Sequence, residues 1–219
     1  TPHNAIAGMP QKKSHIALHG EPRVGKDTIA GILRDDFGFR PAAFADALRE
    51  EICAAYPGVT PTFLTHPASK ESPQPALALS RCRNPDFVRV AQQLLGPESG
   101  TRPLSPRWVM RTWGSEYRRV QSPSYWVAKA QRLLQDYPND RFVFTDNRFA
   151  DETDWLRSIG SVFVTVVRPM QLRTHVVAPT HISDQYRPPT DYLLSNDGGS
   201  LKMLREQVHA MVATLHLND

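Results

Sequence analysis

The stretch Gly20-Glu-Pro-Arg-Val-Gly25-Lys26-Asp27-Thr28 carries the strongest signal in the chain. It matches the Gly-x4-Gly-Lys pattern of phosphate-binding loops. An apolar run, His15–His19, precedes it, and apolar residues at helical spacing follow it from Lys26. Because such a loop lets backbone N–H groups and a helix N-terminus converge on phosphate oxygens, the motif predicts a phosphate site. Its predicted members are Gly20, Arg23, Gly25, Lys26, Asp27 and Thr28.

A magnesium site is predicted beside this loop. The position after the lysine normally carries Ser or Thr, and here it is Asp27, followed by Thr28. Either side chain could reach a metal ion directly or through water, while Asp27 could instead only stabilise the helix start. Asp146 ends another apolar run, 141–145, where a carboxylate can orient magnesium through water or cap the next turn. The predicted magnesium ligands are Asp27, Thr28 and Asp146.

The fold class predicted from periodicity is α/β. Strands are expected at 15–19, 42–44, 141–145, 161–167 and 192–195, and helices at 26–37, 46–56, 86–95, 107–118, 124–137, 151–159 and 201–215. Strands that alternate with helices predict right-handed crossovers, and hence a parallel sheet of about five strands with helices on both faces.

One domain, 14–219, is predicted, with a helical insertion on the substrate side at 57–120. Pro57 ends a helix, and four more prolines before position 76 indicate irregular structure. The polar stretch 1–13 is interpreted as a disordered tail or a remnant of an expression vector.

Composition excludes several classes of protein. The 219 residues are 40% hydrophobic and 22% charged, which excludes a disordered chain, and no run of about 20 apolar residues suggests a membrane span. Cys53 and Cys82 suggest neither a disulfide framework nor a zinc site, which fits a reducing cytoplasm. The net charge is +4, and 81–119 holds eight arginines against three acidic residues. That surplus favours contact with phosphate or nucleic acid, or equally a solvated arginine-rich face.

Several further blocks give the sequence a family resemblance. They are Phe44-Ala-Asp-Ala-Leu48, Trp113-Gly-Ser-Glu-Tyr-Arg118, Thr145-Asp-Asn-Arg-Phe149, Val167-Arg-Pro169, His181-Ile-Ser-Asp184 and Asn196-Asp-Gly198. Together with the loop, and in this order from Ile16 to about Val208, they resemble the deoxynucleoside monophosphate kinases of bacteriophages. The resemblance implies a P-loop kinase fold, ATP and Mg²⁺ as cofactors, and a deoxynucleotide acceptor.

The resemblance also implies an acceptor site. Asp46 is either a substrate-binding residue or a general base for a hydroxyl acceptor, with a helix cap as the alternative. Arginines are candidates for a phosphate clamp, and aromatic side chains could stack on a base or pack in the core. The candidates for the clamp are Arg118, Arg119 and Arg168, and Glu116 could position one of them. Arg148 either contacts phosphate or forms an internal ion pair with Glu152. The others are Trp113, Trp126, His181 on the substrate side and Asn196 near the adenine of ATP.

Three functions are therefore expected in order. The first is transfer of phosphate from ATP to a free deoxynucleoside monophosphate. The second is phosphorylation of the hydroxymethyl group of 5-hydroxymethyluracil within DNA. The third is a nucleotide-binding module without turnover. A cytoplasmic location is expected (host cytoplasm if the gene is a phage's), with no membrane partner, and a homodimer is left open.

Overall fold

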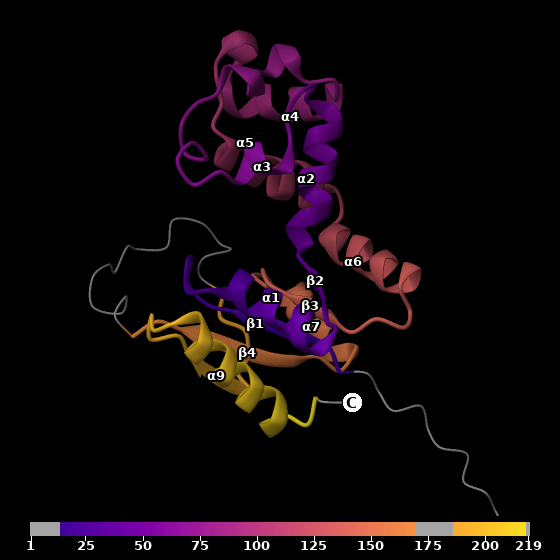
Figure 1. Ribbon diagram of the computed structural model, residues 1–219. Coiled ribbons are helices and arrows are strands. Elements are labelled where there is room, and N and C mark those ends of the chain that lie inside the picture. Colours follow the sequence, from indigo (N-terminus) through magenta and orange to yellow (C-terminus); the bar gives the residue numbers. More distant parts are fainter. Residues whose placement is uncertain (1–13, 170–185, 218–219) are drawn as a thin grey trace, which may run out of the picture. The chain divides into compact units, whose positions relative to one another are not determined.

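The computed structural model describes residues 14–169 and 186–217, and these form two compact units. The sheet unit contains the described residues up to Ala42 and from Asn139 onward, and the helical unit is Ala43–Pro138 (Figure 1). The helical unit is larger than the predicted insertion at 57–120, because it also includes the helices on either side of that segment.

A five-stranded parallel sheet is the centre of the sheet unit, as the sequence predicts. Its strands are β1 (Ile16–His19), β2 (Arg40–Ala42), β3 (Phe142–Phe144), β4 (Val162–Val167) and β5 (Tyr192–Ser195), in the order β2-β3-β1-β4-β5. The strand expected at 42–44 was placed too late in the chain, because helix α2 already begins at Phe44. This α/β architecture is compatible with a P-loop kinase-like fold.

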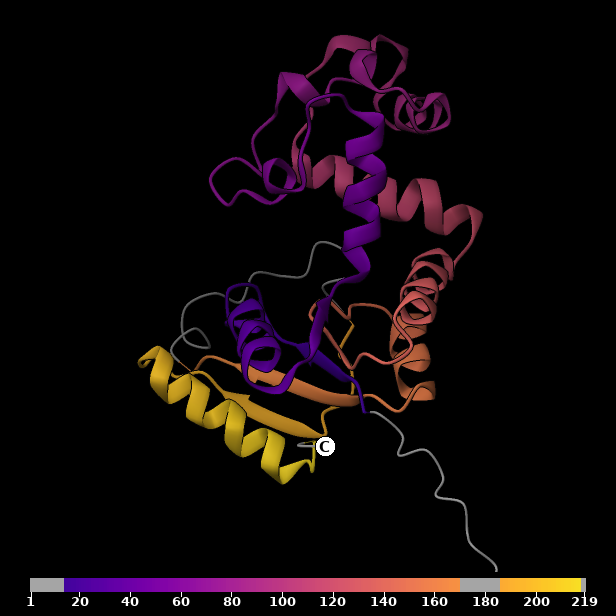
Figure 2. The ribbon, with the colours of Figure 1, turned by 45° about the vertical axis from the view of Figure 1, so that its right-hand side comes forward.

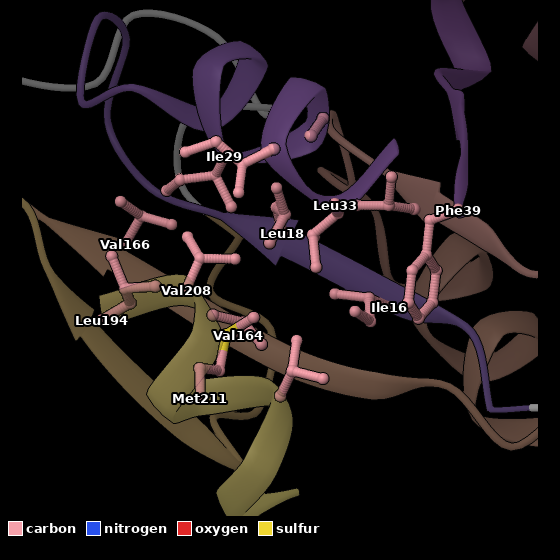
Figure 3. Packing of buried hydrophobic residues seen from close by; sticks show 14 of the residues in the cluster. Ile16, Leu18, Ile29, Leu33, Phe39, Val164, Val166, Leu194, Val208 and Met211 are labelled. Atoms are coloured by element: carbon pink, nitrogen blue, oxygen red, sulfur yellow. The ribbon is translucent and has the colours of Figure 1, made fainter. Parts of the chain in front are cut away.

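Helices cover both faces of the sheet, which explains why its central strands β1, β3 and β4 are mostly apolar. On one face, Ile16, Leu18, Val164 and Val166 pack with helices α1 (Lys26–Phe37) and α9 (Leu201–Thr214) in one hydrophobic core (Figure 3). On the other, helix α7 (Ala150–Ser158) sets Trp155 edge-on against Phe144 of β3, at 5.5 Å between ring centroids. Figure 2 shows α7 in orange and α9 in yellow on opposite sides of the strands.

The strand order creates a switch point between β1 and β3. From β1 the chain crosses through α1 towards β2, and from β3 it crosses through α7 towards β4, on the other side of β1. The connections leave these neighbouring strands in opposite directions, so a crevice opens at their carboxyl ends. The Gly20–Thr28 loop follows β1 and Asp146 follows β3, so both lie at this crevice.

Proline and a polar cap begin three helices of the helical unit. Thr60, Asn84 and Ser105 each accept a backbone N–H at the start of helices α3 (Pro61–Thr65), α4 (Pro85–Leu95) and α5 (Pro106–Thr112). The unit also contains α2 (Phe44–Ala55), α6 (Tyr125–Asp136) and short 3-10 helices at Pro75–Leu77, Leu79–Arg81 and Pro97–Thr101. The helix expected at 107–118 is in fact α5 followed by a π-helix, η4 (Trp113–Arg119).

Candidate functional site

The first position of the Gly20–Thr28 loop requires glycine, because the backbone of β4 lies close to it. Gly20 has φ +151°, and a Cβ on it would lie 2.3 Å from the carbonyl oxygen of Val166 in β4. Gly25, the residue before α1, has φ +105°, which L side chains rarely adopt. Arg23 between them is also left-handed, with φ +66°. These values give the loop the turning backbone that concave anion-binding loops need.

Lys26 is the first residue of α1 and folds back over the loop. Its Nζ donates to the carbonyl oxygens of Gly20 (2.7 Å) and Glu21 (2.9 Å). Burial, and then the positive charge of Arg148, lower the pKa of Lys26 from 10.5 to about 8, while Asp27, Glu21 and Asp146 act in the opposite direction. The ammonium group therefore sits where water is scarce, and an anion of high charge would stabilise it.

The carboxyl end of β1 is joined by a hydrogen bond to the loop that follows β3. His19, the last residue of β1, donates from Nδ1 to the main-chain oxygen of Asn147 at 3.3 Å. Burial lowers the pKa of His19, the cations of Arg187 and Lys26 lower it further, and the bond to Asn147 opposes them. Neither His19 nor Arg187 was predicted from the sequence, because no local pattern shows which strand ends and loops meet.

Asp146 and Asp27 are suited to magnesium. Both act electrostatically on Lys26, so both lie near the loop, and Thr28 is exposed beside Asp27 in the first turn of α1. Mg²⁺ is usually held by one or two carboxylates together with phosphate oxygens and water, rather than by a cage of protein ligands. Among the described residues no cluster of three or more His, Cys, Asp or Glu forms such a cage. The residues thus fit a metal that arrives with a nucleotide.

Glu152 organises the segment that follows Asp146. Its side chain is 2% exposed, and Oε2 accepts the backbone N–H groups of Arg148 (2.8 Å) and Phe149 (3.2 Å), which caps the start of α7. The exposed Arg148 thereby has its backbone held in place near Lys26. Arg187 adds another cation, since its Nη2 lies 3.4 Å from Glu21 Oε1.

The loop Asn196-Asp-Gly198 rests on the Gly20–Thr28 loop. Asn196 Nδ2 donates to the carbonyl oxygen of Val24 at 2.8 Å, and a Cβ on Gly25 would lie 2.6 Å from that same nitrogen. The guanidinium of Arg168 packs against Gly198, 3.3 Å from where a Cβ would stand. Asn196 thus contacts the Gly20–Thr28 loop, and Arg168 lies against the Asn196–Gly198 loop; the nucleotide roles predicted for both stay predictions.

The aromatic candidates lie in the core of the helical unit. Trp113 is 1% exposed and packs against Phe87 and Tyr117, at 4.4 and 5.3 Å between ring centroids. Trp126 is also buried and donates from Nε1 to the carbonyl oxygen of Gly114 at 3.1 Å. Neither ring has a free face for a base, so the core-packing alternative describes both.

Asp46 is the third residue of α2 and caps it. Its Oδ2 accepts the N–H of Ala43 at 2.8 Å, and Oδ1 pairs with Arg49 at 3.3 Å. The carboxylate is still 56% exposed, which leaves room for a further contact.

Glu51, not the predicted Glu116, positions an arginine. Arg118 donates from Nε to Glu51 Oε2 at 2.8 Å, whereas Glu116 is exposed on η4. Arg119 is half-buried and donates to the main-chain oxygen of Pro123 at 3.1 Å. No sequence motif pointed to Glu51, because its partners come from helices that lie 62 to 78 positions further along the chain. His181 lies outside the described residues.

Comparison with known proteins adds no family assignment. No protein-family model matches the chain, and no curated protein matches it significantly. In the part of the chain that the structure describes, no helix has both the length and the apolar character needed to span a membrane.

Proposed function

We propose that the protein is an ATP- and magnesium-dependent kinase that phosphorylates a deoxynucleotide. The observation that carries this proposal is the partly buried Lys26, folded over the loop that follows β1, with Asp27 and Asp146 close to it. A cation, turning backbone and two carboxylates at a switch point are the components that phosphoryl transfer requires.

The candidate site residues of the sheet unit each have a role in this proposal. The Gly20–Thr28 backbone and the N-terminus of α1 bind the donor phosphates, and Lys26 exchanges its carbonyl partners for phosphate oxygens. Arg148 and Arg187 add positive charge as the phosphoryl group moves. Asp146 and Asp27 would hold Mg²⁺, which supplies neutralisation of charge on the phosphates. Asn196 holds the loop that would approach adenine.

The first choice of acceptor is a free deoxynucleoside monophosphate, on the strength of the family resemblance. Its phosphate already carries the attacking oxygen as an anion, so this reaction needs no general base. Asp46 would then contribute to binding of the nucleotide.

A labelling experiment tests the proposal. ATP carrying a labelled γ-phosphate is offered with Mg²⁺ and each deoxynucleoside monophosphate in turn, and we expect a labelled diphosphate. Lys26→Met should reduce transfer by orders of magnitude, while Lys202→Met, which removes an exposed lysine of the same unit, should leave it unchanged. Equal rates for the two variants would remove Lys26 from the mechanism.

Magnesium dependence tests the metal ligands separately. Asp146→Asn should raise the magnesium concentration needed for half-maximal activity and lower the maximal rate. The free energy of unfolding should change little. A magnesium titration that superimposes on the wild type's would leave Asp146 as a cap only.

DNA is the second candidate acceptor, favoured by exposed arginines of the helical unit. Arg81, Arg83 and Arg102 are all exposed there. For the hydroxymethyl group of 5-hydroxymethyluracil, Asp46 would act as general base. Asp46→Asn should then slow the chemical step and leave binding of DNA intact, whereas for a nucleotide acceptor the KM should rise. Binding of ATP without any labelled product from either acceptor would favour a nucleotide-binding module.

A further inference from the structure

Four side chains from two helical segments, η4 and α6, converge on one carboxylate of α2 in the helical unit. Glu51 of α2 accepts Trp113 Nε1 (2.9 Å) and Arg118 Nε (2.8 Å) on Oε2, and the hydroxyl of Tyr125 on Oε1. Lys129 Nζ lies 3.5 Å from Oε1. Burial alone would raise the pKa of Glu51, but the bonds from Tyr125, Trp113 and Arg118 outweigh it and lower the pKa. Glu51 is therefore a fixed negative charge.

Arg118 is held by this carboxylate in one orientation. Its guanidinium carbon lies 4.4 Å from the ring centroid of Tyr117 and 4.8 Å from that of Tyr125, while its Nε is engaged by Glu51. Contact with two aromatic rings and a bond through Nε leave the two terminal NH₂ groups of the fork for another partner.

The local charge is not balanced. Arg118 and Lys129 contribute two positive charges, and Glu51 contributes one negative charge. Lys129 has 42% of its side chain exposed and Arg118 has 21%, so solvent and solutes reach both. A planar fork fixed beside a compact ammonium group is the combination that recognises phosphate, because the fork binds two oxygens at once and the ammonium adds charge.

We propose that Arg118 and Lys129 form a binding site for the phosphate group of the acceptor, and that Glu51 is the positioning residue that orients Arg118. This inference rests on the proposed function, which it deepens by assigning a contact to the acceptor's phosphate. The phosphate is that of a deoxynucleoside monophosphate or a phosphodiester of DNA, and the experiment separates these sources.

The test measures binding in the absence of ATP, so it does not depend on catalysis. The affinity of the full chain for each deoxynucleoside monophosphate and for a short DNA oligonucleotide is measured by calorimetry. Lys129→Met should weaken binding by about tenfold, the value of a lost charge-assisted contact. Arg132→Met removes a positive charge from the exposed face of α6 and serves as the control, with affinity unchanged. The acceptor that shows the difference identifies the source of the phosphate.

Glu51 and Arg118 are tested by variants that keep shape or charge. Glu51→Gln should weaken acceptor binding and raise the acceptor KM, while the KM for ATP stays the same. Arg118→Lys retains the charge but not the fork, so this variant should also bind the acceptor more weakly than the wild type. If Glu51 only holds α2, η4 and α6 together, Glu51→Gln will lower the midpoint temperature of thermal unfolding and will not change acceptor binding selectively.

The outcomes separate this inference from the proposed function. Active kinase with wild-type acceptor affinity in both Lys129→Met and Glu51→Gln would overturn the phosphate site and leave the kinase assignment standing. Phosphate binding that depends on Lys129, in a protein that transfers no phosphate, would support the site and overturn the kinase assignment.

Discussion

Folding disfavours the charged form of Lys26. Its pKa in the folded protein is about 8, against 10.5 for an unperturbed lysine, chiefly because of burial. The folded state therefore binds a proton less readily than the unfolded state. Lys26 therefore does not reduce the free energy of unfolding above pH 10.5, where it is neutral in both states. The free energy of unfolding decreases as the pH falls from 10.5 through 8. Near neutral pH the lysine thus costs stability that a bound phosphate would recover.

Lys26→Met should consequently stabilise the empty protein at pH 7, by about 2 kcal/mol, while it removes activity. The gain over the wild type should shrink as the pH rises from 7 to 10, because the wild-type lysine then loses its proton. Urea unfolding of both proteins across this range, with Lys202→Met alongside, measures the effect. A difference that does not vary with pH would show that Lys26 is not desolvated.

At the scale of the element, two glycines around α1 should respond in opposite directions. Gly31 lies inside the helix, and a Cβ there meets nothing within 4 Å, so Gly31→Ala should stabilise the protein by about 0.5–1 kcal/mol. Gly20→Ala should cost more than about 2 kcal/mol, because its Cβ would lie 2.3 Å from the Val166 carbonyl. Thermal unfolding of the pair checks both signs, and a tolerated Gly20→Ala would mean that β4 can move away.

The connection from β5 to α9 should support the loop before α1. Asn196→Asp cannot donate to the Val24 carbonyl, which is now 2.8 Å from Nδ2, and it places a negative charge beside the loop. We expect a loss of about 1–3 kcal/mol in stability and a higher KM for ATP. Asp197→Asn, at the exposed neighbouring position, is the matched control. An unaltered KM for ATP would separate this connection from the donor site.

For the whole molecule, salt should distinguish the two acceptors. DNA bound by the exposed Arg81, Arg83 and Arg102 would release about one counterion for each phosphate that is neutralised. The logarithm of affinity should then fall against the logarithm of salt concentration with a slope of about −2 to −3, and each Arg→Gln change should reduce the slope by about 1. A single nucleotide should give a much shallower line. Titrations at several salt concentrations provide the measurement.

Local patterns were enough to predict most of the fold. Apolar runs such as Val162–Val167 and helical spacing such as that after Lys26 depend on neighbours in sequence, so five parallel strands and most helices followed directly. The start of α2 was missed because Asp46 caps the helix from its third residue rather than from the first. The π-helix was missed because local spacing does not show its distant partners: Trp126 donates to the carbonyl oxygen of Gly114, and Trp113 donates to Glu51.

Sequence alone was enough to recognise the Gly20–Thr28 loop, Lys26 and Asp146, because each is defined by short spacing within one strand-to-helix connection. Which distant groups meet them depends on how the chain folds. Strand order brings Asn147 to His19, and the return of the chain after β4 brings Arg187 to Glu21. Packing buries Trp113 and Trp126 and joins Arg118 to Glu51 rather than to Glu116. The physical reason is that burial and long-range pairing depend on how elements pack, and residue type alone does not specify that.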